Sequence, residues 1–302
     1  MYNAIHRLAF LIIAGLVCSL AVRAADDKEP LTPSSVIENA TEQDWRSPAQ
    51  ANLLYMDFSG KQVVFELAPD FAPRHIENLR TLVGENYFDG LAIVRSQDNY
   101  VVQWGDPASV PEDARSFGEA KAEVEHEFYR DKQGLEFATI ESRDAYADEV
   151  GFSHGFAVGS DEDGDGARAW LTHCYGTLGV GRALETNSGN SSSLYVVTGH
   201  APRHLDRNVT LIGRVISGMA NLSTVPRGPG EYGFYEDESQ FISIDSIRFG
   251  DQLENEAQLN IEIMRTNTKT FEDYVSSRTH RSHEWFADSA GKIEVCNVGV
   301  PT

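Results

Sequence analysis

Positive charge is scarce in this sequence. Its 302 residues include 25 lysines and arginines against 46 aspartates and glutamates, which gives a formal net charge of −21 at pH 7. A surface of this sign repels nucleic acid and anionic lipid. We therefore expect no nucleic acid among the partners of the chain, and no membrane contact once its N-terminal segment has been removed.

Long apolar runs are equally scarce, because only the stretch from residue 8 to residue 22 qualifies. This stretch follows Arg7 and precedes small residues, which is typical of a secretory signal peptide rather than of a membrane span. We expect residues 1–24 to be cleaved during export, with the bacterial periplasm as the expected compartment. Residues 25–48 are polar and contain prolines, and we expect them to form a flexible lead.

Cysteine is the third rarity, with three in the whole chain. One of them, Cys18, lies in the expected signal peptide. An oxidising compartment favours a disulfide between the other two, Cys174 and Cys296. Two separate buried thiols are the alternative, since the sequence does not give the distance between them.

Patterns typical of metal and cofactor sites are also missing. The histidines lack the spacing of a zinc site, and no phosphate loop or hydrolase triad is recognisable. Residues 161–166, "DEDGDG", open like a calcium loop, but Thr172 stands at the twelfth place, where a bidentate glutamate is expected. We interpret them as an acidic hairpin tip, with a calcium site as the alternative, and the sequence predicts neither metal nor cofactor.

The sequence does contain a succession of strand signals. Residues 53–67 alternate around a Ser-Gly turn, as a β-hairpin does, and residues 73–84 carry a first-turn proline and one apolar stripe, as a helix does. Chains in which strands outnumber helices form barrels or sandwiches. Further strands are expected at 100–104, 194–197, 210–215 and 240–250, with a short helix at 218–224.

Two segments lie outside this strand pattern. Residues 108–169 are charged, and we expect a loop-rich insertion with a helix around 119–129. Residues 251–302 are expected to form a small α/β extension, with a helix around 270–285 and a last strand in "KIEVCNVGV".

Several separate motifs stand in a characteristic order. A hairpin precedes "FAPRHIENL", "YFDGLAIVR" and "YVVQWGDP", and the insertion is followed by "SSSLYVV" and "HLDRNVTLIGRV". This order resembles the cyclophilins, a family of peptidyl-prolyl cis–trans isomerases, over residues 52–106 and 176–250. The resemblance implies a mainly β fold over residues 49–250, namely a closed antiparallel barrel capped by two helices.

The chemistry that the resemblance implies is rotation about an X–Pro bond. Because no bond is made, no nucleophile, metal or cofactor is needed, but a barrier of ~18–20 kcal/mol must be lowered. An enzyme does this by binding the twisted amide more tightly than either planar isomer. By resemblance Arg95 is the donor aimed at the prolyl nitrogen, and Gln103 braces it. A strand arginine in a surface ion pair is the alternative interpretation of Arg95.

The resemblance also assigns the residues that bind the substrate. Many of them depart from the family pattern: Val196 replaces an aromatic residue, Leu194 a glutamine and His204 a tryptophan. These departures predict a shallow proline pocket and weakened catalysis. Plain barrel core, or for His204 an exposed loop, is the alternative. The assigned residues are Tyr100, Val101, Gly181, Leu194, Val196, His204 and Leu205.

The function predicted from the sequence is isomerisation of X–Pro bonds in exported proteins, which assists slow folding steps. The alternative is a catalytically weak or inactive cyclophilin-like module that binds peptides or an assembly partner. Both hypotheses name proline-containing polypeptides as partners, so turnover of a proline tetrapeptide distinguishes them. The sequence carries no signal for the oligomeric state.

Overall fold

The computed structural model describes residues 31–108, 111–163 and 166–302. The predicted signal peptide, residues 1–24, lies outside these ranges. Among the described residues, none of the helices combines the length and apolarity that a membrane crossing requires.

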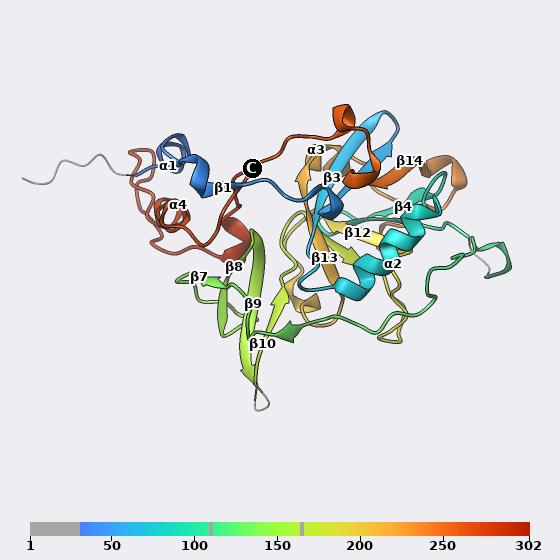
Figure 1. Cartoon of the computed structure of the whole chain (residues 1–302), viewed down its shortest axis with the longest axis horizontal. Coiled ribbons are helices and arrows are strands. Elements are labelled where there is room, and N and C mark those ends of the chain that lie inside the picture. The colour runs from blue at the N-terminus through green and yellow to red at the C-terminus, as the bar shows by residue number, and fades with distance from the viewer. Residues whose placement is uncertain (1–30, 109–110, 164–165) are drawn as a thin grey trace, which may run out of the picture. The chain divides into compact units, whose positions relative to one another are not determined.

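Eight antiparallel strands form the closed barrel that the sequence predicts (Figure 1). Hydrogen bonding between its first and last strands closes the ring. In their order around the barrel the strands are β11 (Thr177–Val180), β12 (Leu194–Val197), β5 (Val101–Gly105), β4 (Ala92–Ser96), β14 (Ile242–Phe249), β2 (Leu53–Phe58), β3 (Lys61–Leu67) and β13 (Leu211–Ser217).

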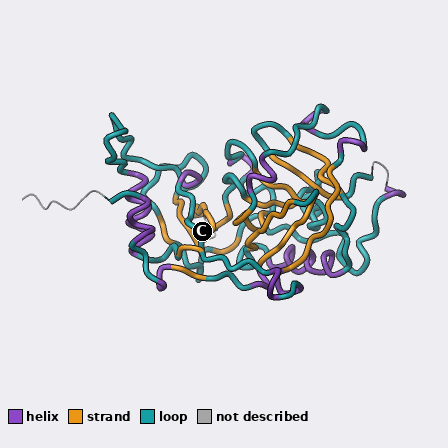
Figure 2. Tube along the Cα trace, turned by 90° about the horizontal axis from the view of Figure 1, so that it is seen from above, coloured by secondary structure: helices purple, strands orange, loops and turns teal. Residues whose placement is uncertain are grey.

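Alternate side chains of these strands fill the barrel, as the pleat of a β-strand requires. Trp104, Val196 and Ile247 are completely buried in this core. Two helices, α2 (Pro73–Gly84) and α3 (Met219–Ser223), add Leu79, Leu82, Leu222 and other apolar residues to it. Both helices were predicted from the sequence. Figure 2 shows that the helices lie outside the strands.

The insertion differs from the loop-rich segment that we predicted. It contains a five-stranded sheet in the order β6 (Arg130–Asp131), β10 (Gly166–Leu171), β9 (Phe156–Asp163), β8 (Glu149–Ser153) and β7 (Ala138–Thr139). The predicted helix at 119–129 is wrong, because this segment consists of turns, bends and irregular loop, and the Glu127 carboxylate accepts hydrogen bonds from Arg74 N and His75 N in the first turn of α2. Two of the strands have only two residues, too few to produce a periodic pattern.

The insertion sheet packs against the outside of the barrel. Phe156, Val158 and Leu171 of the sheet share one apolar cluster with Val101 and Tyr195 of the barrel. The insertion therefore covers part of the outer face of β5 and β12.

The N-terminal lead and the C-terminal extension fold together. Helix α1 (Pro33–Glu38) contacts α4 (Lys269–Thr279), and β1 (Trp45–Arg46) pairs with β15 (Ile263–Met264). The described part of the lead thus differs from the flexible segment that we expected, because Val36 is buried in a cluster with Phe271 of α4.

The extension also differs in detail from the prediction. Helix α4 ends at Thr279, and "KIEVCNVGV" contains a 3-10 turn at Val295–Asn297 instead of a strand. A disulfide joins Cys296 in this turn to Cys174, which lies between β10 and β11. The extension is thereby tied covalently to the barrel.

Candidate active site

A groove of about 410 Å³ lies on the outer face of the barrel, beside β4, β5 and β12. Its lining combines two cations, one amide and a majority of apolar side chains. The lining residues are Arg95, Tyr100, Val101, Gln103, Val180, Gly181, Arg182, Tyr195, Leu205, Val209 and Phe234.

Arg95 reaches this groove because of an irregularity in β4. The pairing of β4 with β5 shifts register between Ile93 and Arg95, and beyond the shift Arg95 lies opposite Gln103. Such bulges redirect side chains and are common beside active sites. Ile93 consequently points into the core, whereas Arg95 is half-buried at the groove.

Three hydrogen bonds hold the Arg95 guanidinium. Its Nε donates to the carbonyl oxygen of Tyr232 at 2.7 Å, Nη1 donates to Gln103 Oε1 at 3.1 Å, and Nη2 donates to Gln97 Oε1. Burial lowers the pKa of Arg95, but arginine starts so far above neutrality that it keeps its charge. The groove therefore contains a fixed cation, and two of its five N–H groups have no partner among the described residues.

Gln103 is itself braced. Its Nε2 donates to Ser193 Oγ at 3.0 Å, while its Oε1 accepts from Arg95. Gly181 leaves room for this pair, since a Cβ at that position would lie 2.8 Å from Ser193 Oγ and 3.1 Å from Gln103 Nε2. The predicted positions of Arg95, Gln103 and Gly181 in one site are therefore consistent with the geometry.

The apolar walls contain three of the predicted substrate-binding residues, namely Tyr100, Val101 and Leu205. The Tyr100 ring centroid lies 5.7 Å from the Arg95 guanidinium carbon. Leu205 is half-buried in a 3-10 turn between two buried residues, Arg203 and Asp206. These positions fit a socket for an apolar ring next to the cation.

Two predicted residues of β12 do not line the groove. Leu194 and Val196 are completely buried inside the barrel, so their assignment to substrate binding is wrong. Successive residues of a strand face opposite sides, and a shift of one residue moves every side chain to the other face. The groove-facing residue of β12 is Tyr195, which is aromatic, so Val196 gives no reason to expect a shallow pocket.

His204 is exposed and does not line the groove, which corrects its assignment as well. The structure adds Tyr195 and Phe234, which the sequence analysis did not assign, and it places Arg182, which by resemblance replaces a substrate-contacting asparagine, in the groove lining. Phe234 comes from the segment before β14 and lies with its ring centroid 5.1 Å from the Arg95 guanidinium carbon. No periodic signal marks this segment, but Tyr195 could have been found from the pairing of β12 with β5.

Together these features define a class of site. A fixed cation, an amide beside it and an apolar socket on the outside of a closed barrel suit an extended peptide with a cyclic apolar side chain. The cation can stabilise charge that develops on the peptide without reorganising during the reaction.

Comparisons with known proteins agree with this class. The family model described as "Cyclophilin type peptidyl-prolyl cis-trans isomerase/CLD" matches residues 53–247. Relatives from Brucella suis biovar 1 (strain 1330) and Brucella abortus (strain 2308), each described as "Probable peptidyl-prolyl cis-trans isomerase", are 24% identical over 177 residues. These alignments cover 59% of this chain and 72% of each relative.

A solved structure shares the fold. The chain superposes on the crystal structure of cyclophilin AquaCyp293 from Hirschia baltica with a TM-score of 0.67 and 22% identity, covering 86% of this chain and 94% of that one. The chain belongs to the cyclophilin-type peptidyl-prolyl cis–trans isomerase family.

Proposed function

We propose that this cyclophilin isomerises X–Pro bonds in exported proteins and that Arg95 is its catalytic donor. The observation that carries the proposal is the Arg95 guanidinium, held by three hydrogen bonds at the edge of an apolar groove. Two features support export: the signal-like N-terminus, and the disulfide between Cys174 and Cys296, since disulfides persist in oxidising compartments such as the bacterial periplasm.

Arg95 acts on the prolyl nitrogen. When the X–Pro bond twists, amide resonance is lost and the nitrogen lone pair becomes localised, so it accepts a hydrogen bond that neither planar isomer offers. A guanidinium N–H pointing into the groove supplies this bond only in the twisted state. Gln103 keeps the guanidinium in place through Nη1, and the apolar walls receive the proline ring.

The decisive experiment compares turnover of a proline tetrapeptide by the wild type and by Arg95→Ala. We expect Arg95→Ala to lower kcat/KM at least about tenfold, because each ~1.4 kcal/mol of lost transition-state stabilisation is worth a factor of ten. Arg95→Lys should recover little, since lysine lacks the planar fork of donors. The rates are measured by NMR exchange spectroscopy.

A matched control is Arg80→Ala on α2. Arg80 is also a partly exposed arginine that bonds a carbonyl, that of Ala51, but it does not line the groove. Arg80→Ala should lower stability somewhat and leave kcat/KM unchanged. Unchanged kcat/KM in Arg95→Ala would refute the mechanism.

A peptide-binding module without useful turnover is the second candidate. The observation that favours this candidate is that the Arg95 guanidinium already has two contacts from the segment before β14. Its Nε donates to the carbonyl oxygen of Tyr232, and its carbon lies over the ring of Phe234. This candidate predicts that the tetrapeptide binds in the groove while its exchange rate stays at the uncatalysed value.

A further inference from the structure

The groove residue Tyr195 is anchored from behind by a buried histidine. Tyr195 contributes to the groove lining, yet the residue is only 7% exposed, and its hydroxyl lies 2.9 Å from His173 Nε2. His173 is completely buried and does not line the groove. Its ring lies nearly parallel to that of Tyr195, with an interplanar angle of 9°.

The partner on the other side of His173 determines the direction of this hydrogen bond. His173 Nδ1 lies 2.8 Å from Asp206 Oδ1, and a carboxylate only accepts. Nδ1 therefore carries the proton, which leaves Nε2 of the neutral ring to accept from the Tyr195 hydroxyl. Burial lowers the pKa of His173, which keeps the ring neutral.

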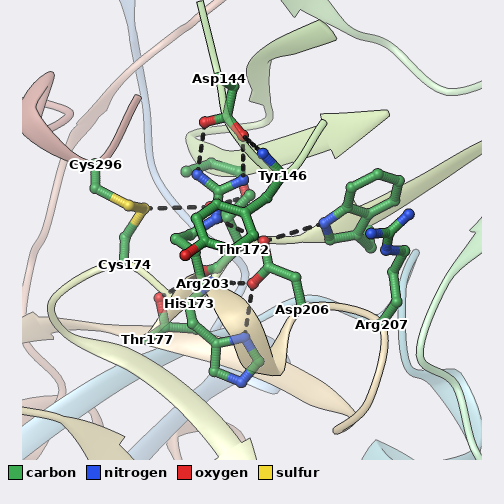
Figure 3. A network of polar contacts seen from close by, with 12 residues as sticks. Asp144, Tyr146, Thr172, His173, Cys174, Thr177, Arg203, Asp206, Arg207 and Cys296 are labelled. Atoms are coloured by element: carbon green, nitrogen blue, oxygen red, sulfur yellow. Dashed lines mark hydrogen bonds and ion pairs between the residues drawn. A yellow bond between two sulfur atoms is a disulfide. The ribbon is translucent and has the colours of Figure 1, made fainter. Parts of the chain in front are cut away.

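Asp206 is held in turn by four donors (Figure 3). Besides His173 Nδ1, its oxygens accept from His173 N at 3.0 Å, Trp170 Nε1 at 3.3 Å and Arg203 Nε at 2.5 Å. Arg203 also forms a bidentate ion pair with Asp144 of the insertion, in which Nη1 donates to Oδ2 at 2.8 Å and Nη2 donates to Oδ1 at 3.0 Å. The carboxylate therefore occupies one defined position.

We propose that His173 is a positioning residue for the peptide groove, which with Asp206 fixes the Tyr195 phenol and hence the wall facing the substrate beside Arg95. The same carboxylate belongs to the turn that carries Leu205, so two walls of the groove are tied to one buried anion. This inference rests on the proposed function, since it assigns the groove to the substrate peptide.

A purely structural role for His173 would have different consequences. A residue that only stabilises the fold lowers stability whether or not Tyr195 carries a hydroxyl. A residue that acts through Tyr195 affects peptide affinity only while the hydroxyl is present. The two roles are therefore separated by a double-mutant cycle.

The cycle consists of the wild type, Tyr195→Phe, His173→Phe and the double variant in the full chain. Tyr195→Phe keeps the ring and removes only the hydroxyl, so it should fold. We expect each single variant to weaken binding of a proline tetrapeptide, and to raise KM, by about three- to tenfold, the range that one net hydrogen bond is worth, with kcat changed less than twofold. The double variant should be no weaker than the worse single variant.

Tyr55→Phe is the matched control. Tyr55 is also buried, and its hydroxyl accepts from Leu259 N, but it does not line the groove. It should lower the melting temperature and leave peptide affinity unchanged. If Tyr195→Phe behaves like Tyr55→Phe, or if the effects of the two single variants add, the positioning role is refuted.

Peptide affinity is measured by NMR titration, which does not depend on turnover. Failure of the proposed function appears as unchanged turnover in Arg95→Ala. Failure of the positioning role appears as additive changes in binding free energy in the cycle. The two outcomes are therefore distinguishable.

Discussion

At the scale of single residues, the groove depends on close approaches that only a small residue permits. Gly181 is the clearest example, because it leaves the space in which Gln103 reaches Ser193. Its backbone does not adopt a left-handed conformation, so the missing side chain rather than backbone freedom explains the glycine.

We expect Gly181→Ala to lower kcat/KM by about three- to tenfold, because its Cβ displaces Gln103 and Ser193 and loosens the hydrogen bond to Arg95. Stability should change little, since the displaced atoms belong to side chains. Gly84→Ala, where a Cβ meets open space, is the control. Wild-type turnover in Gly181→Ala would mean that the position of Gln103 does not matter.

Asp206 makes stability dependent on pH. Burial acts to raise its pKa, but the hydrogen bond from His173 and the charge of Arg203 outweigh this effect and lower the pKa below the usual carboxyl value. A lowered pKa contributes stability that is complete above the unfolded value of about 3.9 and is lost as the pH falls through the folded value.

Asp206→Asn should therefore lower the free energy of unfolding by about 2–4 kcal/mol at pH 7, as loss of a buried charged partner does. The difference from wild type should shrink as the pH falls below about 4, because the unfolded chain takes up the Asp206 proton first and the folded carboxylate follows only at its lowered pKa. Urea unfolding at pH 7 and pH 3 measures both values. Asp237→Asn, at an exposed cap, is the control. A difference in unfolding free energy between wild type and Asp206→Asn that does not vary with pH would contradict the lowered pKa of Asp206.

At the scale of elements, the insertion sheet supports the groove from outside. Phe156 of β9 packs in the cluster that contains Val101 and Tyr195, whereas Phe271 of α4 packs in the cluster of the lead and extension. Both rings are buried, so they form a matched pair.

Phe156→Ala and Phe271→Ala should each cost about 3–5 kcal/mol of stability. Only Phe156→Ala should also raise KM, because it removes packing behind two groove residues. Denaturant unfolding and tetrapeptide kinetics measure the two effects. An equal rise of KM in both variants would show that general loosening, rather than local support, affects the groove.

The extension depends on a covalent link. The bond between Cys174 and Cys296 joins positions 122 residues apart in the sequence. Cross-links of this span stabilise chiefly by restricting the unfolded chain.

Cys296→Ser should lower the free energy of unfolding by about 2–4 kcal/mol and leave turnover within about twofold, since neither cysteine lines the groove. Mass mapping of non-reduced peptides identifies the bond, and urea unfolding gives its contribution. Two free thiols in protein prepared under oxidising conditions would exclude it.

At the scale of the whole molecule, the acidic excess acts against compactness. With a net charge of −21, the acidic side chains repel one another more strongly in the folded state than in the expanded chain. Salt screens this repulsion.

The melting temperature should therefore rise by about 2–4 °C between low salt and 0.5 M NaCl, equivalent to ~1 kcal/mol for a domain of this size. Screening of the ion pairs acts in the opposite direction but concerns fewer charges. Calorimetry at several ionic strengths measures the shift. A falling melting temperature would mean that ion pairs such as Arg203 with Asp144 dominate.

The sequence by itself determined the barrel and the centre of its site. The hairpin at 53–67 and the helix at 73–84 could be predicted because alternation and a first-turn proline act locally, whereas the closed barrel was implied by the resemblance that the order of motifs carries. Arg95, Gln103 and Leu205 were assigned by resemblance to the cyclophilins, and for Arg95 and Leu205 the contrast of a cation or a lone leucine with its neighbours agreed with that assignment. The short strands of the insertion contain no such pattern, so the sequence did not reveal them.

Only the tertiary structure decided which face of β12 forms the groove. Leu194 to Val197 carry no apolar–polar alternation, because the barrel core covers one face and the insertion sheet covers much of the other. A strand buried on both sides does not encode its own orientation. The pairing of Tyr195 with Gln103, and the buried carboxylate behind it, join segments that are distant in sequence, so they follow from the folded contacts alone.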